Sequence, residues 1–370
     1  MEQQPAMESV GMRLFGEHYR GRRVLLTGHT GFKGSWLALW LTELGAHVTG
    51  VALPPDATPN HWDLLRLGIP DHRLDIRDYH VLAQVVKDIQ PEIVFHLAAQ
   101  PLVRRSYRDP LETWSTNVMG TANVLESCRN TESVRAIVVV TTDKCYENRE
   151  WDKGYSETDR LGGHDPYSAS KAAAEIVAAS YRSAFFHEAN SPLLATARAG
   201  NVIGGGDWSE DRLIPDLVRA IAAGTELEIR SPQATRPWQH VLESLCGYLL
   251  LGQKLLEGRR EFAESWNFGP GPEDNRTVEE VLAHLKSHWP ELGWKVTDHP
   301  QPHEAGLLYL DSTKARARLG WHPVWPLEQA LAATADWYRA WLDDGRVASR
   351  AQLAAFTAQA HAAGREWCTS

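Results

Sequence analysis

The stretch "RVLLTGHTGFKGSWLALWLTELG" (23–45) limits the possible folds of this chain more than any other. Five residues of strand character lead into a loop with three glycines, and an apolar helical run follows at once. Gly28 and Gly31 permit a tight turn and close approach to the backbone, and Gly34 lets the helix pack on the sheet. The stretch therefore predicts the strand, turn and helix that open a parallel α/β sheet.

The alternation of strand and helix continues to about residue 200. Stretches at 47–53, 92–98, 135–142 and 193–200 have strand composition, with amphipathic helical stretches between them. Nearly uninterrupted apolar runs are typical of parallel strands that are buried on both faces. The sequence therefore predicts the α/β class, with a doubly wound parallel sheet of the Rossmann type.

The glycine-rich turn also predicts a dinucleotide cofactor. Its G-x-x-G-x-x-G spacing opens a helix whose N-terminus can face a pyrophosphate. His29 and Lys33 lie in the same loop, where they could add positive charge near the phosphates or stay in solvent. Asp75 in "LDIRD" is expected at the adenine edge. We also expect the cofactor to lie against the backbone of Leu97, Ala98 and Ala99, because "HLAAQ" ends its strand with small residues.

The second strand lacks the acidic residue that usually binds the adenosine ribose. Ala52 stands near that point, and Asp56 follows two prolines. The sequence also has no clear arginine for a 2′-phosphate. The choice between NAD and NADP therefore stays open on these residues alone.

Tyr167 and Lys171 stand four positions apart in "YSASKAAAEIVAASYRSAF", a stretch of helical composition. That spacing puts the phenol and the ammonium on one helix face. An adjacent ammonium and a cationic nicotinamide both favour phenolate, so we expect a lowered pKa for Tyr167. The tyrosine could then take a proton from a substrate hydroxyl.

Polar residues at the ends of later strands complete the expected site. Thr142, Asp143 and Lys144 follow the strand at 135–142, at the edge where parallel sheets bind ligands. "RAGNVIGGGDW" supplies Asn201, and two arginines suited to a diphosphate, Arg212 and Arg236, follow in "EDRLIP" and "TRPWQHV".

Composition excludes several classes of partner. The net charge of −9 and the pI of about 6.0 argue against nucleic acid and anionic membranes. The four cysteines have no paired spacing, and residues 1–20 show no signal peptide, which predicts a cytoplasmic protein. The stretch 240–258 is too short and too polar to span a bilayer. "HLKSH" (284–288) lacks the glutamate of a zinc motif, so no metal is expected.

We expect four parts along the chain. Residues 1–20 form an N-terminal extension, and residues 21–200 form the Rossmann domain. A smaller, discontinuous substrate domain occupies 201–345, with some segments that return to the first domain. Residues 346–370 are rich in alanine and are predicted as a C-terminal helical tail.

Taken together, these motifs resemble the extended short-chain dehydrogenase/reductase family, in its nucleotide-sugar branch. The similar stretches run from 28 to 323 and include "GHTGFKGSWL", "HLAAQPLVRRSY", "TNVMGT", "TTDKCYEN", "DPYSASK", "WNFGP" and "LGWHP". Related dehydratases for dTDP- and GDP-linked sugars typically have Asp-Glu after the threonine. This sequence has Asp143-Lys144, which is the form seen in the CDP-sugar members.

The resemblance implies NAD as cofactor and CDP-glucose as substrate, converted to a 4-keto-6-deoxy sugar nucleotide and water. Tyr167, Lys171 and Thr142 would serve oxidation at C4, and Asp143 would protonate the departing 6-hydroxyl, which requires a desolvated acid. Lys144 would either remove the C5 proton or only orient substrate and water. The resemblance adds Thr30, Phe32, Ile76 and Asn117 to the cofactor contacts, and we further predict substrate contacts at Asn267 and His303.

The family also implies a homodimer or homotetramer, in which helices around 110–129 and 167–186 pair with a second copy. Two other functions remain open. An epimerase would share the tyrosine and lysine but would need no acid for water loss. A catalytically silent NAD-binding protein would be free to lose the Thr-Tyr-Lys set, which this chain retains.

Overall fold

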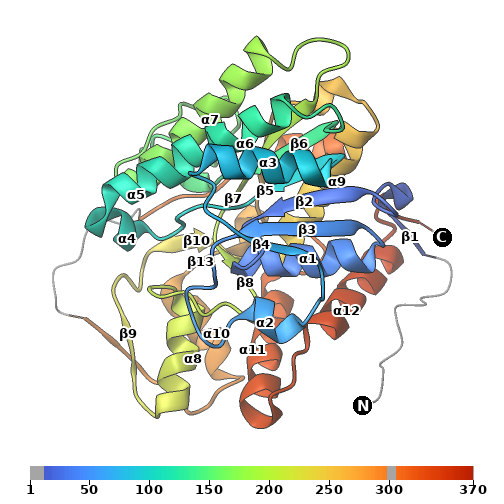
Figure 1. The fold of residues 1–370 in the computed structure, drawn as a ribbon. Coiled ribbons are helices and arrows are strands. Elements are labelled where there is room, and N and C mark those ends of the chain that lie inside the picture. Colours follow the sequence, from blue (N-terminus) through green and yellow to red (C-terminus); the bar gives the residue numbers. More distant parts are fainter. Residues whose placement is uncertain (1–11, 298–305, 370) are drawn as a thin grey trace.

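The computed structural model describes residues 12–297 and 306–369. Its centre is a seven-stranded sheet in which all paired neighbours are parallel (Figure 1). The predicted doubly wound parallel sheet is confirmed. In spatial order the strands are β12 (Ser265–Phe268), β7 (Leu193–Ala199), β6 (Ala136–Val140), β5 (Ile93–His96), β2 (Arg23–Thr27), β3 (His47–Ala52) and β4 (Asp71–Arg73).

Five of these strands coincide with the stretches that the sequence predicts, and two do not. β4 is a short edge strand of three exposed residues, Asp71, His72 and Arg73, so it carries no apolar signal. β12 lies beyond residue 200 and pairs with β7. A segment from the second half of the chain therefore completes the sheet of the first half.

Helices cover both faces of the sheet. α3 (Tyr79–Ile89), α6 (Gly120–Arg129) and α7 (Pro166–Ala184) form one layer, and α1 (Phe32–Glu43), α9 (Val241–Leu256) and α12 (Ser349–Ala362) lie on the other side (Figure 1). Strand residues alternate between the two layers. On β2, Leu25 belongs to the core under α3 and α6, whereas Val24 and Leu26 belong to the larger core under α1 and α9.

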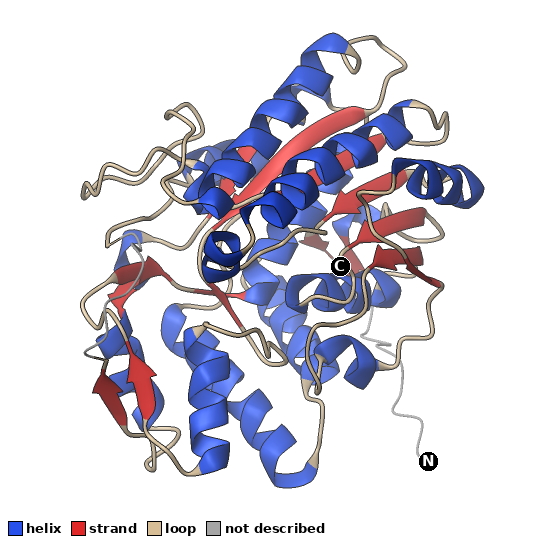
Figure 2. Ribbon diagram, turned by 60° about the vertical axis from the view of Figure 1, so that its left-hand side comes forward, coloured by secondary structure: helices blue, strands red, loops and turns tan. Residues whose placement is uncertain are grey.

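A second group of elements lies to one side of the main layers (Figure 2). It holds α8 (Leu213–Ala223), α10 (Val278–Lys286), α11 (Leu327–Asp344) and three short strand pairs. The pairs are β9 (Leu227–Ile229) with β14 (Trp294–Val296), β10 (Thr235–Pro237) with β13 (Asn275–Thr277), and β8 (Val202–Ile203) with β11 (Gln239–His240). Because α9 and β12 return to the main sheet between these elements, the chain passes repeatedly between the two regions.

The two ends of the described chain meet. β1 (Arg13–Leu14) pairs antiparallel with β15 (Cys368–Thr369), and α12 packs against α1. The apolar helix α9 is buried along nearly its whole length against β6 and β7. Across residues 12–297 and 306–369, no helix is long and apolar enough to cross a membrane.

Candidate active site

A cavity of about 900 Å³ opens at the carboxyl ends of β2, β5, β6 and β7, at the upper end of the size range of ligand pockets. Parallel α/β sheets bind ligands at this edge. Most of the predicted site residues line it. They are Gly28, Thr30, Gly31, Phe32, Lys33, Gly34, Asp75, Ile76, Leu97, Ala98, Ala99, Thr142, Asp143, Lys144, Tyr167, Lys171, Asn201, Arg212 and Arg236.

The glycine-rich turn forms a tightly packed cradle between β2 and α1. Gly28 has a φ of +76°, and a Cβ there would lie 2.6 Å from the Ala98 nitrogen. A Cβ on Gly34 would lie 2.0 Å from the Gly28 oxygen, whereas one on Gly31 would meet that oxygen only at 3.4 Å. Gly28 and Gly34 are therefore required by packing. The space beside Gly31, at the N-cap of α1, is open to a ligand.

His29 does not face the cavity as a phosphate contact. Its ring is fully buried with its edge against Trp62, and Nε2 lies 2.9 Å from Asp71 Oδ1. Burial lowers the pKa of His29, although Asp71 opposes the shift. The histidine therefore ties the turn to the edge strand β4.

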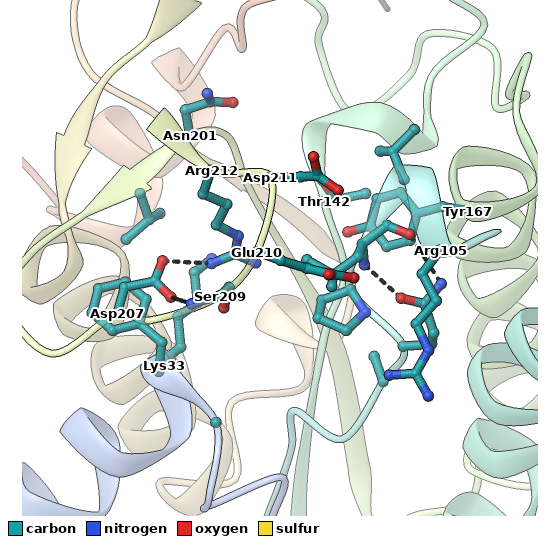
Figure 3. Close-up of a pocket in the computed structure, with 18 of the residues that line it drawn as sticks. Lys33, Arg105, Thr142, Tyr167, Asn201, Asp207, Ser209, Glu210, Asp211 and Arg212 are labelled. Atoms are coloured by element: carbon teal, nitrogen blue, oxygen red, sulfur yellow. Dashed lines mark hydrogen bonds and ion pairs between the residues drawn. The ribbon is translucent and has the colours of Figure 1, made fainter. Parts of the chain in front are cut away.

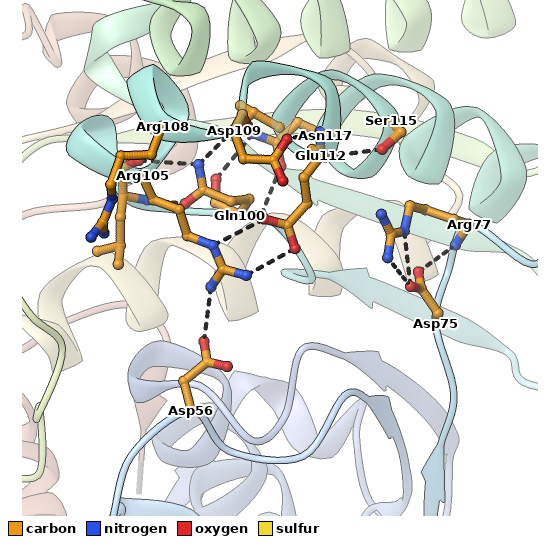
Figure 4. Close-up of polar contacts among 12 residues, drawn as sticks. Asp56, Asp75, Arg77, Gln100, Arg105, Arg108, Asp109, Glu112, Ser115 and Asn117 are labelled. Carbon is orange, nitrogen blue, oxygen red and sulfur yellow. Dashed lines mark hydrogen bonds and ion pairs between the residues drawn. The ribbon is translucent and has the colours of Figure 1, made fainter.

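The adenosine end of the cradle has no acidic side chain at the end of β3. Asp75, the predicted adenine contact, lines the cavity but forms a two-pronged hydrogen bond with Arg77 (Figure 4). Asp56 is 82% exposed and lies 3.7 Å from Arg105, which also pairs with Glu112. Asp56 and Arg105 thus face each other across this end of the cavity.

Tyr167 and Lys171 lie in the first turns of α7. The helix begins with Pro166 after the N-cap Asp165, whose side chain accepts a hydrogen bond from the Ser168 nitrogen. Tyr167 is buried, and both Tyr167 and Thr142 line the cavity (Figure 3). Burial raises its pKa to about 12, so the expected lowering by Lys171 is wrong for the protein without its ligands. Burial outweighs the positive charge of Arg212, which acts to lower the pKa of Tyr167.

Lys171 is also buried, and its Nζ donates to the Val140 carbonyl at the end of β6, at 3.3 Å. Burial lowers its pKa to about 8, while the negative charge of Glu175 acts in the opposite direction. Glu175 lies one helical turn further along α7. It forms a bidentate ion pair with Arg198 of β7, with bonds of 2.9 and 2.8 Å.

Thr142, Asp143 and Lys144 follow β6 as predicted. Asp143 is almost fully buried, and its Oδ1 accepts a hydrogen bond from Thr142 at 2.9 Å and lies 3.7 Å from Lys144 Nζ. Its Oδ2 is buried without a hydrogen-bond partner among the described residues. A side chain at Gly200 would crowd that oxygen, since a Cβ there would lie 3.0 Å away. One carboxyl oxygen is thus left for a ligand in the cavity.

The predicted arginines reach the cavity with different partners. Arg212 forms an ion pair with Asp207 at 2.9 Å, and the two face each other near Lys33 (Figure 3). Arg236 is 9% exposed and donates to the carbonyls of Thr235 and Gly306. Both guanidinium groups hold positive charge in the wall of the cavity.

Three predicted contacts are not in the lining. Asn117 is buried and forms hydrogen bonds with the backbone of Gln100 and with the Ser170 hydroxyl. These bonds position the loop after β5 against α7. Asn267 accepts from Tyr146 and donates to the carbonyls of Tyr155 and Asp311. The amide groups of both are engaged within the protein, so direct ligand contact is not supported for either. His303 lies outside the described residues.

Several lining residues were not predicted. Arg104 of α4 (Val103–Arg108) forms an ion pair with Asp211 at 2.9 Å, and Arg230 approaches the same carboxylate at 3.4 Å. Asp207 pairs with Arg212. The motifs "LVRRSY", "GGGDW" and "EDRLIP" contain most of these residues, but only the fold brings α4 against the loop before α8.

This fold and site define a class of protein. A Rossmann sheet, a G-x-x-G-x-x-G cradle and a Thr-Tyr-Lys set at one cavity are the features of the extended short-chain dehydrogenases and reductases. The site holds in addition a buried acid, Asp143, where an acid catalyst for water loss would be useful.

Comparisons with known proteins agree with this class. The family model described as GDP-mannose 4,6 dehydratase matches residues 25–334. The CDP-glucose 4,6-dehydratase of Salmonella typhimurium is 48% identical over 344 residues, which is 90% of this chain and 96% of that protein. A dTDP-glucose 4,6-dehydratase of Xanthomonas campestris is 29% identical over 337 residues, 85% of this chain and 92% of that protein.

Solved structures share the fold. The dTDP-glucose 4,6-dehydratase of Streptomyces venezuelae, solved with NAD bound, has a TM-score of 0.72 at 24% identity and covers 85% of this chain and 96% of its own. UDP-glucose 4-epimerase of Thermotoga maritima has a TM-score of 0.75 at 24% identity, with 86% and 99% covered. The chain belongs to the GDP-mannose 4,6-dehydratase family of nucleotide-sugar enzymes.

The cradle generates a testable prediction at Gly31. Replacing Gly31 by valine should leave the fold intact, because its φ of −76° is open to any residue and its Cβ has room. The side chain should occupy the space where a pyrophosphate meets the helix, so affinity for NAD and NADH should fall about tenfold or more. Fluorescence titration with NADH and thermal unfolding followed by circular dichroism measure the two effects.

The matched control is Gly293→Val, which does not line the cavity and meets only ordinary contacts. It should bind NADH as the wild type does. Unchanged NADH affinity in a folded Gly31→Val protein would contradict the assignment of the cradle.

Proposed function

We propose that this chain is an NAD-dependent CDP-glucose 4,6-dehydratase, a hydro-lyase that converts CDP-glucose to CDP-4-keto-6-deoxyglucose and water. The 48% identity to the Salmonella typhimurium CDP-glucose 4,6-dehydratase, over 90% of the chain, supports the reaction and the nucleotide. The observation that carries the chemistry is the buried Asp143, with one unpartnered oxygen, beside Tyr167 and Lys171 in a single cavity.

The cofactor is NAD, and the residues of the cavity fit it. The space that Gly31 leaves at the N-terminus of α1 suits a pyrophosphate, and Ala98 and Ala99 let a nucleotide lie against the end of β5. The ribose end offers no acidic side chain at the end of β3, so the family supports NAD over NADP more strongly than these residues do. Bound NAD would accept hydride from the sugar C4 and return hydride at C6.

Tyr167 is the residue that takes the proton of the 4-hydroxyl. Because burial raises its pKa to about 12, it needs positive charge nearby to act as a base at neutral pH. Lys171 supplies that charge from the same helix face, and the Thr142 hydroxyl, which lines the same cavity, orients the phenol or the substrate hydroxyl. Tyr167 is therefore the base, Lys171 is the cation that favours its phenolate, and Thr142 supplies the orienting hydroxyl.

Asp143 and Lys144 serve the loss of water. A ketone at C4 acidifies the C5 proton, and the 6-hydroxyl leaves once it is protonated. Asp143 donates that proton; its Oδ2 is buried beside Gly200 and has no hydrogen-bond partner among the described residues, so it can face the 6-hydroxyl. Lys144 lies 3.7 Å from the same carboxyl group and is our proposed group for the C5 proton.

The diphosphate of the substrate is bound by Arg212 and Arg236. Both line the cavity and belong to segments that follow residue 200, and Arg212 lies near Lys33 of the glycine-rich turn. Charge-assisted hydrogen bonds from arginine to phosphate are strong and directional. Binding by Arg212 exchanges part of its pairing with Asp207 for the phosphate oxygens.

The function is tested by turnover of purified protein with CDP-glucose and, as the matched comparison, dTDP-glucose. We expect CDP-glucose to give a 4-keto product, detected by absorbance at ~320 nm in alkali, and dTDP-glucose to react far more slowly. An epimerase would change the sugar without forming a stable ketone, and a silent binding protein would leave both sugars unchanged. Equal turnover of the two sugars would refute the nucleotide assignment.

The two halves of the reaction should separate by mutation. Tyr167→Phe removes the base, so no reduced cofactor should form on addition of CDP-glucose. Asp143→Asn keeps size and polarity but cannot act as an acid. Reduced cofactor should then accumulate, seen at ~340 nm in a single turnover, while product falls by roughly 10²–10⁴.

The Lys144→Ala variant completes this comparison. If Lys144 removes the C5 proton, this variant should also accumulate reduced cofactor and should lose exchange of the C5 proton with deuterated solvent. A loss of binding alone would assign Lys144 to substrate orientation. If Asp143→Asn blocks cofactor reduction as fully as Tyr167→Phe does, the division of labour is wrong.

We also propose that the enzyme is at least a dimer, formed through α5 (Pro110–Trp114), the π-helical segment η2 (Ser115–Met119), α6 and α7. These helices are neighbours and all lie on the α7 side of the sheet (Figure 1). They expose three large apolar side chains, which are Leu111 at 79%, Met119 at 57% and Ile176 at 59%. Exposed apolar patches of this kind mark interaction surfaces. A second copy of the same helices would cover them as a four-helix bundle.

Sedimentation velocity tests this assembly. The wild type should sediment as a dimer or tetramer, and Leu111→Glu should shift it toward monomer by placing a charge in the apolar interface. Val81→Glu on α3 is the matched control, since Val81 is 47% exposed on a different helix, and it should not change the sedimentation. A monomeric wild type at working concentration would rule the interface out.

The cellular location that we propose is the cytoplasm. All four cysteines are buried free thiols in the structure; they are Cys128, Cys145, Cys246 and Cys368. Unpaired thiols suit a reducing compartment, which is also where NAD and nucleotide sugars are made available to such enzymes.

A further inference from the structure

The loop at 204–208, "GGGDW", carries the acidic partner of Arg212. Arg212 Nη1 lies 2.9 Å from Asp207 Oδ2, and the Ser209 nitrogen donates to Oδ1 of the same carboxylate at 3.0 Å (Figure 3). Both members of the ion pair line the cavity, but the Asp207 side chain is 5% exposed and the Arg212 side chain is 35% exposed. Asp207 is therefore the buried member of the pair, and Arg212 is the member that a ligand can reach.

Arg212 needs an acidic partner because other cations are close to it. Its charge acts on Lys33 of the glycine-rich turn and reaches Tyr167. Like charges repel, so a protonated Lys33 would drive an unpaired Arg212 away from the catalytic residues. Among the described residues only Nη1 of Arg212 bonds to Asp207, which leaves its other N–H donors to face the cavity. One bond to Asp207 can thus set the direction of the guanidinium without occupying it.

Aromatic side chains on two sides hold the backbone of the 204–208 loop. The Tyr338 hydroxyl of α11 donates to the Asp207 carbonyl at 2.6 Å. The preceding residue, Trp337, packs directly on the loop, since a Cβ on Gly205 would come within 1.9 Å of its ring. From the opposite side, Trp36 Nε1 of α1 donates to the Gly205 carbonyl at 2.9 Å. The backbone that carries Asp207 is therefore fixed between α1 and α11.

A chain of hydrogen bonds ties α11 and α12 to the helix of the cofactor cradle. Trp337 Nε1 donates to the hydroxyl of Ser349, the first residue of α12, at 2.8 Å, and Ser349 Oγ lies 2.7 Å from His61 Nε2. His61 Nδ1 lies 2.8 Å from Ser35 Oγ of α1, and that hydroxyl donates its own proton to the Phe32 carbonyl. Nδ1 of His61 is therefore the donor, and Nε2 accepts from Ser349. These bonds hold the Trp337 ring in one place.

The contacts from α11 and α12 lie outside the part of the chain that the family model describes. That match ends at residue 334, whereas Trp337, Tyr338 and Ser349 follow it. The segment 335–369 is thus more than an outer covering of the sheet, because two of its residues contact the loop that carries Asp207.

We propose that the C-terminal segment 335–369 positions the arginine that binds the substrate diphosphate: Trp337 and Tyr338 fix Asp207, and Asp207 directs Arg212 into the cavity. Asp207 and Tyr338 are positioning residues, since they act through Arg212 and not on the reacting atoms. The inference deepens the proposed function and rests on it for the identity of the ligand.

A purely competitive role for Asp207 predicts the opposite result. If the carboxylate only withheld Arg212 from the phosphate, its removal would free the guanidinium and strengthen binding. If the carboxylate directs Arg212, its removal weakens binding. The sign of the change in KM for CDP-glucose therefore separates the two roles.

The experiment measures initial rates with CDP-glucose at saturating NAD in the full-length protein. Arg212→Met should raise KM about tenfold or more and leave kcat within about twofold, because a diphosphate contact is present in ground state and transition state alike. Asp207→Asn, which keeps size and polarity, and Tyr338→Phe, which removes only a hydroxyl, should each raise KM roughly threefold to tenfold. The dissociation constant of CDP, measured by calorimetry, should rise by the same factors without any turnover.

Double variants test whether the two positioning residues act through Arg212. In the Arg212→Met protein there is no guanidinium to direct, so adding Asp207→Asn or Tyr338→Phe should change KM by less than about twofold. Residues that affect the substrate independently would multiply KM by the same factor in both backgrounds.

Tyr19→Phe is the matched control for the loss of a buried hydroxyl. Tyr19 is also buried, and its hydroxyl donates to the Leu249 carbonyl at 2.5 Å, but it does not line the cavity. This variant should lose about as much thermal stability as Tyr338→Phe and keep the wild-type KM. If Tyr338→Phe does not fold, Asp207→Asn with its double variant decides the question.

The inference is overturned if Asp207→Asn leaves KM unchanged or lowers it, or if its effect is as large in the Arg212→Met protein as in the wild type. A folded Tyr338→Phe protein with the KM of the Tyr19→Phe control would also overturn it. A wild type that neither binds CDP nor converts CDP-glucose would overturn the proposed function together with this inference. Normal wild-type turnover with unchanged KM in both variants would overturn the inference alone.

Discussion

The buried ion pair between Glu175 and Arg198 is the interaction on which the arrangement of the site depends. Burial alone would raise the pKa of Glu175, but Arg198 and the hydroxyls of Thr141 and Thr196 lower it to about 2. Arg198 and Thr196 belong to β7, Thr141 directly follows β6, and Ser265 of β12 joins them. A charge buried in this way is costly unless every partner is in place, so the pair holds α7 at one position on the sheet.

The position of α7 on the sheet also places the catalytic residues in the first turns of this helix. Lys171 is one turn from Glu175 and donates to the last carbonyl of β6, and Tyr167 is one turn further. The strand that ends at Val140 then delivers Thr142 and Asp143 to the phenol. The catalytic groups thus come from the first turns of α7 and from the short segment directly after β6, which the ion pair and its hydroxyl partners hold together.

Cations gather around the catalytic residues of the cavity, although the chain as a whole is acidic and acidic residues also line the cavity. The protein carries a net charge of −9, yet the wall of the cavity holds Lys33, Lys144, Lys171, Arg212 and Arg236. A substrate and a cofactor that both carry diphosphates explain this concentration of cations. Burial, aided by the neighbouring Arg212, lowers the pKa of Lys33, and these cations provide the positive charge that a buried tyrosine needs to act as a base.

The sequence by itself determined the local units: the five long strands of the sheet, the glycine-rich turn, and the helix that carries Tyr167 and Lys171. The periodicity of apolar residues, the spacing of the glycines and the four-residue spacing of Tyr167 and Lys171 are local properties. They can therefore be recognised without knowledge of the fold. Only the tertiary structure decided which strands complete the sheet, since β4 is polar and β12 returns from residue 265. It also decided that Asn117 and Asn267 brace the protein, that Glu175 pairs with Arg198, and that burial raises the pKa of Tyr167. Partners and desolvation depend on contacts between residues far apart in the chain, and no local pattern records them.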